Sequence, residues 1–355
     1  MVKRRDRVTC YDVAERAGVS QSTVSRALAG SRVVSEATRE RIREIARSLN
    51  YHVDTSASSM RSGRITTVAV VVIGPPSGDV RVYNPFHYTL MAAICAAASA
   101  QGLETIVSFQ STPDRFKGSY EVERKALGVI AIGTSENAPA WAYFRDLARQ
   151  GWNVVSWGAP DADMDWVGAD NHAGGQMATR HLLDLGCRHI AFVGTGEEGP
   201  RQFAERRAGY GEAMARAGLA GRHVEVPAGL SRHAQGRMAA DLLLDTGEPL
   251  EGIVAACDSL ALGTLERLRE RGRDVPRDVR LIGFDGTRAA YHASPSLSSI
   301  EPDFHTAGAL LVERLLAQCG EQARMASACR QAQADLQAGH RAPVRLIDRD
   351  RVLVH

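Results

Sequence analysis

Hydrogen-bonding side chains are concentrated in one short segment near the N-terminus, GVSQSTVSRALAG, which spans residues 18–30. Val24 and Leu28 are four positions apart, so a helix over this segment would turn both toward a protein core. Its opposite face would carry an amide, hydroxyls and a guanidinium, from Gln21, Ser22, Ser25 and Arg26. An amide can pair with the edge of adenine and a guanidinium with that of guanine, while hydroxyls bond to bases or phosphates. These residues therefore predict DNA reading; the alternative is a polar surface without a partner.

The common catalytic motifs are missing from the sequence. It contains no GxSxG, HExxH or GxxxxGK[ST] motif, and its six cysteines form neither a CxxC pair nor a cluster with histidines. His181 and His189 are expected to be structural. We therefore predict a binding protein, not an enzyme, that holds no metal and no cofactor.

One pattern supports a different function, that of an NAD-dependent oxidoreductase. GTGEEG places Gly194, Gly196 and Gly199 in the G-x-G-x-x-G spacing of dinucleotide-binding loops, and Glu225 follows in a later strand-like run. Two features disfavour this alternative. The carboxylates at positions 197 and 198 would repel phosphates, and the motif lies in the middle of the chain, whereas such loops open the first βαβ unit.

Three short helices are predicted to position the polar segment. Thr9, Ser20 and Ser35 can cap their N-termini, and Gly18 and Gly30 can end the first two. The third helix has apolar residues at helical spacing, at positions 42, 45, 46 and 49. Two short helices joined by a tight turn and covered by a third form a helix-turn-helix unit, whose second helix places its first residues in the major groove of DNA.

Charge is distributed unevenly along the 355 residues. Residues 1–64 contain 13 Lys and Arg against 7 Asp and Glu, whereas the remaining 291 residues contain 30 against 34. A basic head on a slightly acidic body indicates that the head binds a polyanion. The alternative is a solvated basic tail.

The segment VTCYDVAERAGVSQSTVSRALAGSRVVSEATRERIREIARSLNYHV resembles the DNA-binding domain of the LacI/GalR family of bacterial transcription regulators. The resemblance implies that Gln21 and Ser22 occupy variable base-reading positions and that Arg26 is a third reader. It further implies contacts with phosphates by Tyr11, Thr23 and Ser25. Ser20 is also predicted to be a DNA-binding residue.

The next segment, residues 53–65, resembles the hinge of that family. In the family, paired hinge helices enter the minor groove of DNA, and an apolar side chain opens a base step. Met60 stands at that position here. Val53 and Asp54 replace the Pro and Asn that family members often have, which would loosen the entry into the hinge.

Apolar runs of strand length alternate with helical stretches from residue 65 onward. Such runs predict parallel sheets covered on both faces, and the length of the body predicts two lobes. The resemblance covers nearly the whole chain and implies a small all-α helix-turn-helix head on an α/β body of two Rossmann-like lobes, as in periplasmic binding proteins. The ligand of such lobes binds in the cleft between them, outside the carboxyl ends of the strands.

The predicted domains are a helix-turn-helix domain over residues 1–52, a hinge over 53–65 and an effector-binding and dimerisation domain over 66–355. Within the last domain, we expect an N-terminal lobe of about residues 66–165 and 294–328. The C-terminal lobe would then comprise about residues 166–293 and 329–355.

The resemblance also implies an effector site. Arg206 and Asp285 match positions that bond the effector, Phe86 and His87 match a position that lines the pocket, and Asp258 stands in a block of polar contacts. Cys257 and Gly286 replace an Asn and an Asp of the family. The alternatives are that the two aspartates are helix N-caps and that Arg206 is a surface residue.

The resulting prediction is a cytoplasmic, homodimeric repressor that binds operator DNA under the control of a small molecule, a sugar or sugar derivative. No apolar run reaches the roughly 18 residues of a membrane span, and no apolar stretch follows the basic N-terminus as in a signal peptide. The missing signal sequence and the basic helical head disfavour a periplasmic solute receptor.

Overall fold

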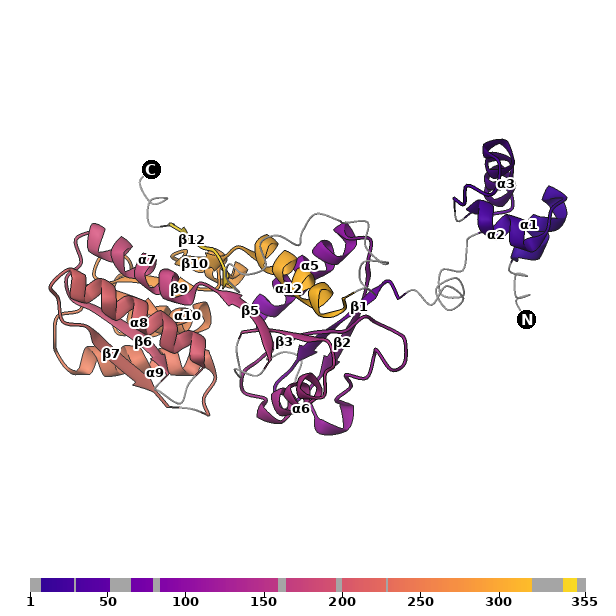
Figure 1. Ribbon diagram of the computed structural model, residues 1–355. Helices are drawn as coiled ribbons and strands as arrows, with labels where there is room; N and C mark the ends of the chain where they lie inside the picture. The colour runs from indigo at the N-terminus through magenta and orange to yellow at the C-terminus, as the bar shows by residue number, and fades with distance from the viewer. Residues whose placement is uncertain are drawn as a thin grey trace, which may run out of the picture. The chain divides into compact units, whose positions relative to one another are not determined.

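The computed structural model describes residues 8–28, 30–51, 65–78, 84–158, 164–195, 200–227, 229–320 and 341–349. They belong to two compact units, Met1–Arg64 and Ile65–His355, here called the head and the body (Figure 1).

The head contains the three predicted helices, α1 (Cys10–Ala17), α2 (Gln21–Leu28) and α3 (Glu36–Ser48). Their apolar faces meet in one small core that includes Val13, Val24 and Ile42, all fully buried. Gly18 ends α1 with a φ of 64°, a left-handed conformation that glycine adopts at little cost. The helix-turn-helix prediction is confirmed.

Two arginines of α3 bind the carboxyl ends of the other helices. Arg41 donates to the carbonyl oxygen of Ala17 at 2.5 Å, and Arg39 donates to that of Gly30 at 3.0 Å. A cation is favourable at a helix C-terminus, where carbonyl groups lack intrahelical partners. The third helix therefore fixes both elements of the helix-turn-helix.

The first sheet of the body is parallel, in the order β11-β5-β4-β3-β1-β2. Its strands are β1 (Thr67–Ile73), β2 (Glu104–Gln110), β3 (Val129–Gly133), β4 (Val154–Trp157), β5 (Asp165–Ala169) and β11 (Arg341–Ala342). Helices α5 (Pro85–Ala100) and α12 (Phe304–Gln318) cover one face, and α6 (Ala138–Arg149) covers the other, while a short 3-10 helix, η2 (Pro113–Arg115), follows β2 (Figure 1). We call this sheet and its helices the first lobe.

The second sheet has the order β12-β10-β9-β8-β6-β7 and forms the second lobe. Its strands are β6 (Ile190–Thr195), β7 (Arg222–Val226), β8 (Gly252–Ala255), β9 (Arg280–Phe284), β10 (Ser298–Pro302) and the antiparallel edge strand β12 (Val344–Ile347). Its helices are α7 (Asn171–Asp184), α8 (Arg201–Arg216), α9 (Arg232–Asp245), α10 (Asp258–Glu270) and α11 (Arg288–His292).

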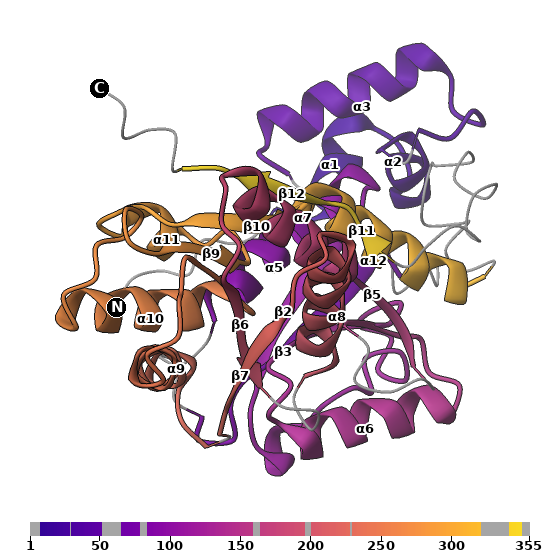
Figure 2. The ribbon, with the colours of Figure 1, turned by 90° about the vertical axis from the view of Figure 1, so that its left-hand side faces the viewer.

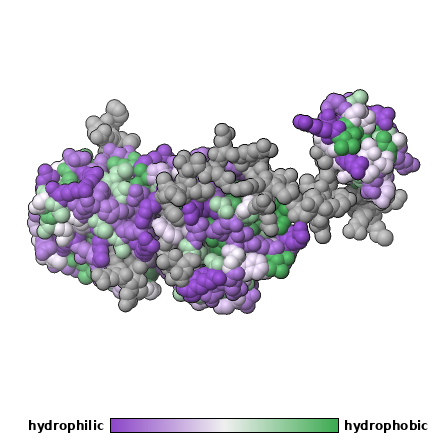
Figure 3. Space-filling model, in the orientation of Figure 1, coloured by the Kyte–Doolittle hydropathy of each residue, from purple (hydrophilic) through white to green (hydrophobic). Residues whose placement is uncertain are grey.

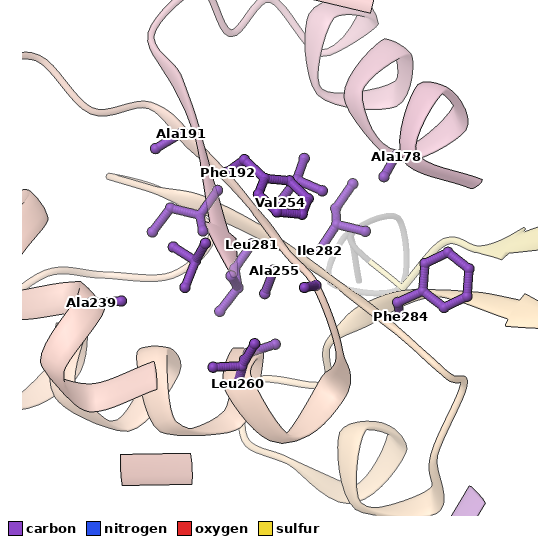
Figure 4. Packing of buried hydrophobic residues seen from close by; sticks show 14 of the residues in the cluster. Ala178, Ala191, Phe192, Ala239, Val254, Ala255, Leu260, Leu281, Ile282 and Phe284 are labelled. Carbon is purple, nitrogen blue, oxygen red and sulfur yellow. The ribbon is translucent and has the colours of Figure 1, made fainter. Parts of the chain in front are cut away.

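The helices of the second lobe pack on its sheet in pairs, α7 with α8 and α9 with α10 (Figure 2). Figure 4 shows Ala178 of α7 on one side of the strands and Ala239 and Leu260 of α9 and α10 on the other. The strand residues between them are fully buried, as the continuous apolar runs predict. The α/β body of two lobes is therefore confirmed.

Three segments cross between the lobes, and their positions differ from the expected boundaries. Strand β10 lies in the range expected for the first lobe but pairs with β9 and β12, and β11 lies in the range expected for the second lobe but pairs with β5. Strand β5 begins at the expected boundary, residue 165, but its residues 166–169 lie in the range expected for the second lobe, and the strand pairs with β4 in the first sheet. The reason is that an apolar run does not reveal which sheet it joins.

The crossover between β11 and β12 is hydrogen-bonded to the other two crossovers, which follow β5 and β10. The amide of Asp170, after β5, donates to the carbonyl oxygen of Ala342 at 2.9 Å, and the amide of Asp303, after β10, donates to that of Pro343 at 2.8 Å. Both aspartates also cap the helices that follow, α7 and α12. The three connections are thus held together by backbone hydrogen bonds.

The surface of the body is mixed in character. Figure 3 shows hydrophobic residues as separate patches among hydrophilic ones on the face in view. Among the larger apolar side chains that the described residues expose are Tyr88 of α5 and Val107 and Phe109 of β2. The rings of Tyr88 and Phe109 lie 6.2 Å apart. Since β2 is an edge strand, this corner of the first lobe combines apolar side chains with an open strand edge.

Candidate functional site

The polar face of α2 is presented to solvent. Ser22, Ser25 and Arg26 are exposed, and Gln21 is partly exposed, while Val24 on the opposite face is fully buried. The periodicity of the sequence therefore places the predicted readers on the side that faces away from the core.

Ser20 and Thr23 organise the start of α2. The Ser20 hydroxyl accepts a hydrogen bond from the amide of Thr23 at 3.2 Å and lies 2.9 Å from the hydroxyls of both Ser22 and Thr23. This bond caps the helix, so Ser20 holds the first turn in which the readers stand.

Tyr11 projects from the first turn of α1 with 69% of its surface exposed, as a contact with a phosphate would require. Met60, with Val53 and Asp54, lies outside the described residues. The wedge and the hinge therefore stay predictions.

Among the described residues of the head, the ion pairs lie on α3. On α3, Arg43 pairs with Glu36 and Glu40, and Arg47 pairs with Glu40. Within the described part of the head, Arg16, Arg26 and Arg32 form no ion pair. Arg26 thus presents a guanidinium that no carboxylate among the described residues neutralises, on the same face as Gln21 and Ser22.

Arg206, on α8, lies in the interior of the second lobe with 6% of its surface exposed. Its Nε donates to Oδ1 of Asn171 at 3.0 Å, and its Nη1 donates to the carbonyl oxygen of Ala256. Its guanidinium carbon lies 3.4 Å from the centre of the Phe284 ring. The alternative of a surface position for Arg206 is wrong, because the side chain is buried and its orientation is fixed.

Asp285 follows directly after β9 and lies 3.6 Å from Nη1 of Arg206. Its φ of 112° is unusual for a residue with a side chain, and its amide donates to the carbonyl oxygen of Ile300 at 2.8 Å. Burial raises the pKa of this carboxyl to about 7, although Arg206 acts in the opposite direction. A strained backbone that holds a buried carboxyl beside a guanidinium is typical of a functional site.

Asn84 of the first lobe interacts with Asp285. Asn84, which caps α5, shares a hydrogen bond with the Asp285 side chain, and Phe86 and His87 follow it in the first turn of the helix. The Phe86 ring lies 5.8 Å from that of Trp157 and 5.2 Å from that of Phe304. Burial lowers the pKa of His87 to about 4, so its imidazole is neutral at pH 7. Phe86 thus packs in the core of the first lobe, close in sequence to Asn84, which reaches Asp285.

Asp258 is the predicted effector residue that the structure places apart from this group. It is fully buried at the start of α10, where Oδ2 accepts from the amide and hydroxyl of Thr287, at 2.6 and 2.9 Å. Its Oδ1 accepts from the hydroxyl of Ser299 at 2.7 Å. Both oxygens are therefore occupied in holding the loop that carries Asp285, and we expect this structural role for it.

The two departures from the family pattern have local consequences. Cys257 is buried at the N-cap of α10, where burial raises the pKa of its thiol to about 12, so it is an uncharged and unreactive group. Gly286 has a φ of 66°, and a Cβ there would lie 2.6 Å from Cγ of Glu301. The acidic residue of the family would therefore not fit at this position.

Sequence reasoning did not single out Asn84 or Asn171, although they orient Asp285 and Arg206. Asn84 precedes Pro85, a combination that signals the start of a helix. Asn171 has no such local signal.

Three other features bear on function: metal-binding clusters, membrane-spanning helices and the GTGEEG loop. The described residues include no group of three or more His, Cys, Asp or Glu side chains that could hold a metal ion. None of the helices described is long and apolar enough to cross a membrane. Of the GTGEEG loop, residues 196–199 lie outside the described residues, and Pro200 starts α8 directly after it.

Two family models match the chain, and together they span more than half of it. The model for bacterial regulatory proteins of the lacI family matches residues 9–54, and that for a periplasmic binding protein-like domain matches residues 179–339.

Curated relatives and solved structures agree with these models. The chain is 29% identical to the HTH-type transcriptional regulator CelR of Thermobifida fusca, over 91% of this chain and 96% of that protein. It is 27% identical to the HTH-type transcriptional repressor PurR of Aliivibrio fischeri strain MJ11, over 87% and 90%.

Among solved structures, a transcriptional regulator CelR–cellobiose complex matches with a TM-score of 0.63 and 25% identity, over 97% of this chain and 99% of that one. The lac repressor dimer bound to operator and an anti-inducer matches with a TM-score of 0.69 and 23% identity, over 96% and 98%, which shows the fold. The relatives named here are transcriptional regulators, and the chain belongs with them to the LacI family of bacterial regulatory proteins.

Proposed function

We propose that the chain is a homodimeric repressor that binds a specific operator through α2 and releases or retains it according to a small molecule bound between the two lobes. The observation that carries the first half is the exposed face of α2, with an amide, hydroxyls and an unneutralised guanidinium. This set suits the edges of bases in the major groove. The NAD-dependent oxidoreductase is not proposed further, because the relatives named above are regulators.

The second half rests on the group around Arg206 and Asp285. A carboxylate that accepts hydrogen bonds and a guanidinium that donates them suit a polyol such as a sugar. The CelR structure contains cellobiose, which supports a sugar or sugar derivative as the effector here. Because Asn84 and Asp285 come from different lobes, a ligand that bonds both would change the arrangement of the lobes.

A dimer is supported by the corner of the first lobe formed by Tyr88, Val107 and Phe109. A second copy would cover these apolar side chains and the edge of β2. Two heads would then read the two halves of a symmetric operator. By linkage, an effector that weakens operator binding must itself bind the DNA-bound protein less tightly.

DNA recognition is tested by selecting a preferred operator from random duplexes with the full chain and then measuring variants on it. We expect Arg26→Ala and Gln21→Ala each to lose about 1–3 kcal/mol of specific binding, because each removes a base contact. Arg47→Ala is the control, since it removes an equal charge from α3, where Arg47 pairs with Glu40. Equal operator affinity for both α2 variants and the parent would contradict the assignment of the readers.

Effector binding is tested by a thermal-shift screen of sugars and sugar derivatives, since a ligand that binds only the folded state raises its melting temperature. Asp285→Ala should abolish the response to the compound found while operator binding stays intact. Unaltered affinity for that compound in the variant would show that the effector binds elsewhere.

A further inference from the structure

A second arginine lies close to Arg206 and has no part in the site described above. Arg232 is the first residue of α9, and Ser231 caps that helix. The guanidinium carbon of Arg232 lies 5.1 Å from the centre of the Phe203 ring, and that of Arg206 lies 5.5 Å from the same centre. Two cations are thus packed on one aromatic ring, which is itself 7% exposed.

The two guanidinium groups differ in their acidic partners. Arg206 lies beside Asp285 within the second lobe. Arg232 instead reaches the first lobe, where its Nη2 lies 3.3 Å from Oε1 of Glu136, just before α6. The Glu136 side chain is 58% exposed, and an ion pair with so exposed a carboxylate contributes little to stability. Glu136 is therefore a partner that another anion can replace.

Apart from Glu136, the acidic groups that act on this pair of arginines are Asp258, Asp285 and Glu205, and Glu205 pairs with Arg201 and Arg341. Asp258 is buried, and its oxygens are occupied by Thr287 and Ser299. The raised pKa of Asp285 means that its carboxyl carries only part of a negative charge at neutral pH. The neutral imidazole of His87 adds none. Once Glu136 is displaced, Arg206 and Arg232 together carry more positive charge than the negative charge of Asp258 and Asp285 balances.

We propose that the effector carries an anionic group, a carboxylate or a phosphate on a sugar-like body, and that Arg232 binds this group. In the absence of the effector, Glu136 occupies the same place on Arg232. The planar guanidinium suits both groups because it donates two parallel hydrogen bonds to carboxylate or phosphate oxygens. This inference rests on the proposed function, namely that a small molecule binds between the lobes.

The exchange of partners on Arg232 determines whether Glu136→Gln raises or lowers the affinity for the effector. If an anionic effector displaces Glu136, then Glu136→Gln removes a competitor and the effector binds more tightly. If the effector is neutral, the pair between Arg232 and Glu136 persists in the complex as a contact between the lobes. The same substitution would then weaken binding or leave it unchanged.

The experiment uses the full chain and matched compounds that differ in charge: glucose, glucuronate and glucose 6-phosphate, and galactose, galacturonate and galactose 6-phosphate. Thermal shifts show whether the glucose or the galactose compounds bind, and calorimetry measures the affinity of each compound that does. We expect one anionic member to bind at least tenfold more tightly than its neutral counterpart. The carboxylate and phosphate arms show which anion is recognised.

Variants then assign the effect to Arg232. Arg232→Gln should weaken binding of the anionic compound at least tenfold and leave the affinity for the neutral counterpart unchanged. Arg232→Lys should restore part of the lost affinity. Glu136→Gln should tighten binding of the anionic compound several-fold. The melting temperature and operator affinity of each variant show that it is folded. A neutral compound that binds as tightly as its acid, or an Arg232→Gln variant with parental affinity, overturns this inference and leaves the proposed function standing. A panel in which no compound binds, neutral or anionic, overturns the sugar-like effector of the proposed function itself.

Discussion

Replacing Asp258 with alanine removes the acceptor of three donors at once, the partly buried amide and hydroxyl of Thr287 and the buried hydroxyl of Ser299. A buried donor without a partner costs about 1–3 kcal/mol. Part of this cost is offset, because the hydroxyls can turn and because the desolvation of the carboxylate, which raises its pKa, no longer opposes folding. We therefore expect a net loss of about 3 kcal/mol in the free energy of unfolding of the second lobe.

Thermal denaturation followed by circular dichroism measures this loss. A change of 1 kcal/mol shifts the melting temperature of a 150–250-residue unit by about 2–4 °C, so Asp258→Ala should melt about 6–12 °C below the parent. Asp258→Asn keeps an oxygen toward Thr287 and should lose about a third of this. Asp245→Ala is the matched control, since that carboxylate is exposed on α9 and forms only a surface pair with Arg271. A melting temperature for Asp258→Ala equal to that of the control would refute the reasoning.

Three further outcomes are expected. The folded state holds the Asp285 proton up to a pH of about 7, whereas the unfolded state releases it near 3.8, so the stability falls as the pH rises through this window. Asp285→Asn lacks this loss. Its melting temperature should therefore exceed that of the parent by more at pH 8 than at pH 5. Gly308→Ala should destabilise the first lobe, since a Cβ there would lie 2.6 Å from the backbone of Ala93, whereas Gly211→Ala on α8 meets open space and should stabilise by up to about 1 kcal/mol in urea titrations. Arg41→Gln should lower the melting temperature of the head, because it weakens the bond to the Ala17 carbonyl, with unchanged melting of the body as the control.

The head could be predicted from the sequence almost completely, because its helices are specified locally. Thr9, Ser20 and Ser35 mark the helix starts, and Gly18 marks the end of α1. Each signal acts over a few residues, and the apolar periodicity then determines which side of α2 faces outward.

The body was less predictable where long-range pairing decides the structure. An apolar run such as that of β10 satisfies the pattern of either sheet, so its place becomes clear only from its partners. Asp258 shows the same limit of sequence-based prediction at the site. A carboxylate that follows a strand gives the same sequence pattern whether it binds a ligand or a neighbouring loop. Arg232 and Phe203 come from separate helices, and no spacing along the chain indicates that they meet.

The crossovers between the lobes have a consequence for how the protein is made. The first sheet receives β11 at residues 341–342, and α12, at residues 304–318, covers one of its faces. A ribosome that has completed β1 to β5 has therefore released a sheet on which α5 alone covers a face that α5 and α12 share in the folded protein. The second sheet likewise waits for β12. Neither sheet can be completed during synthesis until residues 341–347 emerge, so the nascent chain exposes aggregation-prone apolar surface until then.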